Sequence, residues 1–136
     1  MADIQHTLTI KTAPAKVYEA VTTQAGLSGW WAKQTIAKPE VDFVNTFTFG
    51  TLSNEFKVTK LSSNKRVEWQ CIHSIEEWMG THVIFDLEEK DGNTVLRFTH
   101  GNWKRVTDMY ARCNYDWARF LRSLKLLCET GTGEPA

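Results

Sequence analysis

The chain has 136 residues, which fits one folded domain, and 42% of them are hydrophobic and 24% charged, proportions that exclude a disordered protein. Sixteen Lys and Arg residues balance sixteen Asp and Glu residues, and this lack of a basic surplus argues against nucleic-acid binding. The N-terminus has no signal-peptide pattern, and no apolar run approaches the roughly 18 residues that span a bilayer. Three widely spaced cysteines indicate free thiols, so we expect a cytoplasmic protein without membrane insertion.

The N-terminal third predicts one strand followed by two short helices. Residues 6–10 alternate between polar and apolar types, which is typical of a strand. Pro14 suits the first position of a helix. A second brief helix is expected to carry Trp30 and Trp31.

The middle of the chain predicts an antiparallel meander. Short alternating segments are separated by turn residues, with Asp91-Gly92 the strongest hairpin signal. Strands joined by short turns pair with their neighbours. The expected strands cover residues 43–49, 54–61, 66–73, 81–88 and 94–100.

The last element is predicted to be a long amphipathic helix over residues 105–129, ended by Gly131. Its apolar stripe comprises Val106, Met109, Tyr110, Cys113, Trp117, Phe120, Leu121, Leu124 and Leu127. A helix of this length needs a sheet to cover that stripe. We therefore predict one α+β domain over residues 1–136, in which a curved antiparallel sheet wraps around the helix and the tail 130–136 frays.

Strand alternation also predicts where a cavity would lie. His73 and His100 end two strands that run in the same direction, so both are expected at the same end of the sheet and on its inner face. Two strand spacings separate them by roughly 9 to 10 Å, too far for one metal ion but within reach of one small molecule. The candidate ligand-binding residues are Trp69, Cys71, His73, Phe85, Phe98, His100, Met109, Tyr110, Cys113 and Trp117. No metal and no cofactor is predicted.

Plainer interpretations of these residues stand beside this one. An inward His at a strand end is more often a hydrogen-bonded structural residue than a functional one, and a ring-bearing stripe is more often core than pocket. Cys113 lies on an apolar helix face, which raises the pKa of a thiol and favours packing over nucleophilic catalysis. Phosphate-binding, zinc-protease and serine-hydrolase motifs are absent from the sequence.

Three segments in order resemble one known family, the activators of the heat-shock-protein-90 ATPase and their homologues. Residues 17–23 followed by Trp30-Trp31 resemble the family's N-terminal signature, and residues 98–101 resemble its late strand. Residues 116–121 and 129–135 are similar to its closing helix and tail. The resemblance covers residues 8–135. It implies the helix-grip fold of the START-like, Bet v-type (SRPBCC) superfamily, with a further minor strand near residues 35–38.

The resemblance supports the fold more than the function. Because superfamily members bind hydrophobic molecules, our leading hypothesis is a non-catalytic domain that binds a small hydrophobic or amphipathic ligand between sheet and helix. The first alternative is a cyclase- or dehydratase-type enzyme with His100 as general acid and base, although no inward carboxylate is predicted to orient it. The second is a chaperone-linked protein-interaction module that uses Trp78 and the Trp30-Trp31 pair.

Overall fold

The structure, a computed structural model that describes residues 1–136, is built on one antiparallel sheet of seven strands. The spatial order is β1-β7-β6-β5-β4-β3-β2, so each strand after β1 pairs with its neighbour in the chain and β1 closes against β7. The strands are β1 (Ala2–Ile10), β2 (Gln34–Ile36), β3 (Val44–Phe49), β4 (Leu52–Ser62), β5 (Arg66–His73), β6 (His82–Lys90) and β7 (Asn93–Trp103).

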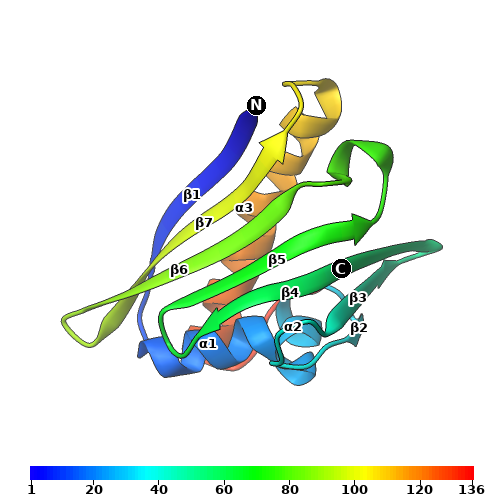
Figure 1. Cartoon of the computed structure of the whole chain (residues 1–136). Coiled ribbons are helices and arrows are strands. Elements are labelled where there is room, and N and C mark those ends of the chain that lie inside the picture. The colour runs from blue at the N-terminus through cyan, green and yellow to red at the C-terminus, as the bar shows by residue number, and fades with distance from the viewer.

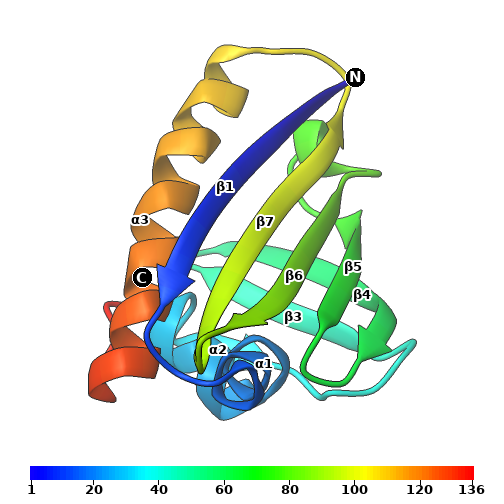
Figure 2. The ribbon, with the colours of Figure 1, turned by 90° about the vertical axis from the view of Figure 1, so that its left-hand side faces the viewer.

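Three α-helices complete the fold. The short helices α1 (Pro14–Thr22) and α2 (Gln24–Trp30) lie together at one end of the sheet, and the long helix α3 (Asp108–Thr130) runs along its concave side (Figures 1 and 2). The prediction of a curved antiparallel sheet around a long C-terminal helix is confirmed. The minor strand expected from the family resemblance is present as β2.

Helix α3 begins three residues later than predicted. The Thr107 side chain accepts a hydrogen bond from the Tyr110 amide, which caps the helix and fixes its start at Asp108. Val106 therefore precedes the helix and is 68% exposed, so its assignment to the buried stripe was wrong. The other end is as expected, because Gly131 adopts the left-handed conformation (φ 88°) that stops the helix.

A β-bulge at the end of β5 overturns the predicted orientation of His73. Cys71 pairs with Phe56 and His73 pairs with Glu55, so Ile72 is an extra residue on β5. Because side chains alternate between faces, one inserted residue reverses the direction of those that follow. His73 is consequently exposed and does not share the inner face with His100, contrary to our expectation.

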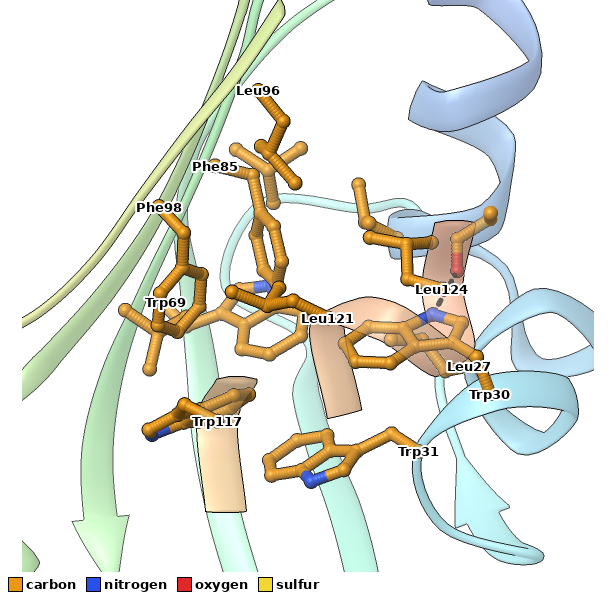
Figure 3. Packing of buried hydrophobic residues seen from close by; sticks show 14 of the residues in the cluster. Leu27, Trp30, Trp31, Trp69, Phe85, Leu96, Phe98, Trp117, Leu121 and Leu124 are labelled. Carbon is orange, nitrogen blue, oxygen red and sulfur yellow. Dashed lines mark hydrogen bonds between the residues drawn. The ribbon is translucent and has the colours of Figure 1, made fainter. Parts of the chain in front are cut away.

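The space between sheet and helices is filled by aromatic side chains (Figure 3). The Trp31 indole lies at the centre of this core, with ring centroids 5.0 Å from Trp117 and 6.2 Å from Trp69. Trp30 stacks on Trp31, and its indole nitrogen donates a 2.9 Å hydrogen bond to the Ala20 carbonyl. These rings pack against one another and fill most of the space between the sheet and the helices.

The C-terminal tail is docked, although the sequence led us to expect that it frays. The Ala136 amide donates to the Trp31 carbonyl (2.8 Å), and the Lys33 amide donates to the Ala136 carbonyl (3.2 Å). The Glu134 amide donates to the Ser123 hydroxyl at 2.6 Å. The tail thus fastens the end of α2 to the middle of α3.

Candidate functional site

Four of the predicted ligand-binding residues are aromatic core residues. The Phe98 and Trp117 rings lie 4.5 Å apart, and the Trp69 and Phe85 rings lie 5.2 Å apart in an edge-to-face arrangement. All four side chains are at most 2% exposed. These four rings pack against one another, and Trp117 is the only one of them that also borders the pocket described below.

His100 is held in a chain of buried hydrogen bonds. The Trp117 indole nitrogen donates to His100 Nδ1 at 3.0 Å, and His100 Nε2 lies 2.9 Å from the Thr81 hydroxyl. Because Nδ1 accepts, the ring proton resides on Nε2 and is donated to Thr81. Thr81 in turn donates to the Trp78 carbonyl at 2.6 Å. Both imidazole nitrogens are therefore used structurally.

Burial keeps His100 neutral. Removal from water, and to a smaller extent the charge of nearby His82, lower the pKa of His100 from 6.5 to about 3. A general acid and base needs a pKa close to the working pH and a nitrogen within reach of the substrate. His100 has neither, and the geometry gives it the structural role of joining β7 and α3 to Thr81, the residue that precedes β6.

The other predicted residues lie around this core. Met109 packs on its surface, and the Tyr110 hydroxyl donates to the Asp3 carbonyl (2.8 Å), which fastens α3 to β1. Cys71 is buried, and burial raises the pKa of its thiol to about 11. His73 points to solvent. Of the ten predicted residues, only Cys113 and Trp117 line the apolar pocket between α3 and the β3–β4 hairpin.

That pocket has a volume of about 200 Å³ and lies at the end of the sheet occupied by the β3–β4 hairpin and the β5–β6 connection. Helix α3 and the 3-10 turn η1 (Glu76–Trp78) form its other walls. Eight of its eleven lining residues are hydrophobic, and the set comprises Trp31, Phe49, Leu52, Asn54, Ser74, Ile75, Trp78, Cys113, Asp116, Trp117 and Phe120. Its wall is thus mainly apolar and opens to solvent.

The polar groups of the pocket are few and mostly acceptors. Asn54 is buried, donates to the Phe47 carbonyl at 3.2 Å and accepts from the Ser74 hydroxyl. Asp116 is about half exposed at the rim and pairs with Arg119, with 3.1 Å between the guanidinium and Oδ1. The buried indole nitrogen of Trp78 has no hydrogen-bond acceptor.

Cys113 is the one thiol in the pocket wall. Burial is the largest influence and raises the pKa of its thiol, the Trp78 indole N–H lowers this pKa by a smaller amount, and the carboxylates of Asp116 and Glu77 add still smaller increases. A thiol in such surroundings stays protonated at neutral pH and is a poor nucleophile. The pocket is therefore equipped for binding through packing and hydrogen bonds, without an activated nucleophile.

Sequence reasoning missed most of the pocket wall. Phe49 and Leu52 flank the turn at Gly50. Two apolar residues beside a turn are only a weak sequence signal of a functional surface. Ser74 and Ile75 lie in the loop after the bulge, where strand alternation no longer applies. No group of three or more His, Cys, Asp or Glu side chains is placed to hold a metal ion. None of the helices is both long enough and apolar enough to cross a membrane.

Comparisons with known proteins place the chain among relatives of the same fold. It is 44% identical to the Aha1 dimer from Colwellia psychrerythraea, with a TM-score of 0.90 over 98% of this chain and 100% of that one. A protein from Staphylococcus saprophyticus shares the fold at 17% identity, with a TM-score of 0.81 over 99% of this chain and 98% of that one. CalU16 from Micromonospora echinospora also shares it, at 14% identity and a TM-score of 0.77 over 97% of this chain and 76% of that one. A search of curated proteins gives no match. The model of the family "Activator of Hsp90 ATPase homolog 1-like protein" matches residues 11–129, and the chain belongs to this family.

Proposed function

We propose that the protein binds a small apolar or amphipathic molecule in the pocket between α3, the β3–β4 hairpin and the β5–β6 connection. The observation that carries this proposal is the pocket itself, because its wall is aromatic and aliphatic and opens to solvent beside a few polar groups. Ligand sites in proteins have this composition, with a mainly apolar lining and a small number of polar groups that orient the ligand.

The volume limits the size of the ligand. A cavity of roughly 150 Å³ accepts benzene, and drug-sized molecules occupy roughly 300 to 1000 Å³. A pocket of about 200 Å³ therefore fits one ring or a short branched chain of about ten non-hydrogen atoms. At about 0.5 kcal/mol per atom such a ligand would bind with about 5 kcal/mol, which corresponds to a dissociation constant of a few tenths of a millimolar.

The test is an NMR titration of the amide and indole N–H signals with toluene, indole and cyclohexanol at millimolar concentration. We expect saturable shifts at Ser74, Asp116 and the Trp78 indole, and no comparable shifts at the opposite end of the sheet. The variant Leu52→Trp places a larger side chain at the mouth and should weaken binding at least about tenfold. Ile36→Trp makes the same kind of change at another exposed strand residue outside the pocket and should bind normally.

Two results would refute the proposal. One is the absence of saturable shifts at pocket residues with all three probes. The other is equal binding by Leu52→Trp and by the Ile36→Trp control, since a ligand bound elsewhere would be insensitive to the mouth.

A second candidate function is self-association through the same end of the molecule. Leu52, Ile72 and Met79 are all between 39% and 42% exposed, and each lies in or next to a segment of the pocket wall. The relative from Colwellia psychrerythraea was solved as a dimer. If two copies meet here, Leu52→Asp should shift a concentration-dependent dimer towards monomer in sedimentation velocity, whereas Ile36→Asp should not. A wild-type chain that stays monomeric at millimolar concentration would exclude this candidate.

A further inference from the structure

Five aromatic rings surround the pocket. They belong to Trp31, Phe49, Trp78, Trp117 and Phe120, and they come from four separate parts of the chain. Centroids are 5.6 Å apart for Trp31 and Phe49, and 6.3 Å apart for Phe49 and Phe120, so the rings border one common space. The face of an aromatic ring carries partial negative charge and attracts cations, most strongly where water is excluded.

The only charged residue in the pocket lining is Asp116, and no Lys, Arg or His is part of it. The Arg119 guanidinium contacts Oδ1 of Asp116, and Oδ2 makes no hydrogen bond or ion pair with another side chain. The same guanidinium lies 5.6 Å from the centroid of the Phe120 ring, so this ring already attracts a cation, and a guest at the rim would compete with Arg119 for Asp116 in a weak, exposed ion pair. A cation inside the pocket would therefore meet a carboxylate at the rim.

The charged groups near the Cys113 thiol also bear on which charge the pocket accepts. The Cys113 thiol in the wall is influenced by the carboxylates of Asp116 and Glu77, both of which disfavour a further negative charge there. Ser74 uses its hydroxyl proton for Asn54 and presents lone pairs to its other neighbours. The rings, the carboxylates and the Ser74 oxygen favour a positively charged guest, and the Trp78 indole N–H is the one group of the lining that favours an acceptor atom.

Building on the proposed function, we infer that the pocket selects small organic cations, namely a quaternary or primary ammonium group attached to a compact apolar body. The ammonium group would lie against the ring faces on the side of Asp116, and the apolar body would fill the space between Phe49 and Trp117. Because the pocket has a volume of about 200 Å³, we infer that the ligand is a free small molecule of about ten non-hydrogen atoms or fewer.

The experiment compares choline with 3,3-dimethyl-1-butanol, a neutral molecule of the same shape in which carbon replaces the charged nitrogen. Binding of each is measured by NMR titration of the pocket signals at low and at high salt. We expect choline to bind about 5- to 30-fold more tightly than the alcohol at low salt, the range for a cation over aromatic rings. Because surface charge is screened by salt, the preference should shrink as salt is added but persist in part.

Asp116→Asn tests the carboxylate. It should weaken choline binding about three- to tenfold and leave the alcohol unchanged, because the amide keeps the shape of the side chain and removes its charge. Glu134→Gln is the matched control: it breaks another exposed carboxylate–arginine pair, 3.0 Å long with Arg122, outside the pocket. This control should leave both ligands unaffected.

The outcomes separate the two proposals. If choline and the alcohol bind equally well and Leu52→Trp weakens the binding of both, the inference of cation selection is wrong. The proposed function, ligand binding in this pocket, would still hold. If neither choline nor the alcohol binds, and toluene, indole and cyclohexanol do not bind either, the proposed function itself is wrong. Tighter binding of a lysine-containing peptide than of choline would overturn the commitment to a free small molecule, because the natural guest would then be a protein side chain.

Discussion

Protonation of His100 should make the protein sensitive to acid in a window set by its burial. The side chain is fully buried, and its pKa is lowered from 6.5 to about 3 because the charged form loses its hydration. Between these two values the unfolded chain binds a proton that the native state does not bind. The free energy of unfolding therefore falls as the pH drops from about 6.5 towards 3, and does not change for this reason above pH 7.

The magnitude follows from the width of the window. Each pH unit below 6.5 removes about 1.4 kcal/mol. At pH 5 the loss due to His100 should reach about 2 kcal/mol, a large part of the 5 to 15 kcal/mol that is typical of a domain. Protonation would also eliminate the acceptor that Nδ1 offers to the Trp117 indole, which is why the fold resists it.

Urea unfolding at pH 7.5, 6 and 5 measures this loss directly, in the wild type and in His100→Gln. The variant cannot titrate, so the wild-type curve should fall about 2 kcal/mol further than the variant curve between pH 7.5 and 5. His73→Gln at an exposed strand end is the control and should follow the wild type. Parallel curves for wild type and His100→Gln, or an NMR titration of His100 with a midpoint near 6.5, would refute the reasoning.

Two further predictions concern the tail and the buried thiols. Gly133→Ala places a methyl group against the Gly29 carbonyl oxygen, so the tail should detach and the free energy of unfolding should fall by about 1 kcal/mol. Hydrogen exchange of the tail amides should become faster, and unchanged exchange would contradict this prediction. Burial raises the pKa of the Cys71 and Cys128 thiols to about 11 each, so neither should react with Ellman's reagent at pH 8 until the protein unfolds. Rapid reaction of either thiol in the native protein would show that it is accessible as a thiolate.

The sequence predicted the elements and the architecture because these depend on local patterns. The period-two alternation of β5 to β7 and the apolar stripe of α3 are readable from neighbouring residues, and the family resemblance added β2. Helix boundaries were less accurate, since the start of α3 depends on whether the Thr107 hydroxyl caps it.

Most of the pocket wall was not predicted, because it depends on contacts between distant segments. The inserted Ile72 reverses His73 and is not visible in an otherwise regular strand. The burial of His100 depends on Trp117 and Thr81, which lie 17 and 19 residues away in the chain. Inward alternation identified the ring-bearing faces correctly, but it cannot distinguish rings that fill a core from rings that border a pocket.

The distribution of indoles has a practical consequence for spectroscopy. Five of the six tryptophans are at most 2% exposed and are packed in the interior, whereas Trp78 in the η1 turn is partly exposed and borders the pocket. A water-borne quencher such as iodide can therefore reach one emitter and leave the others bright. The red edge of the native emission becomes an intrinsic optical reporter of the pocket mouth, without any added dye or label.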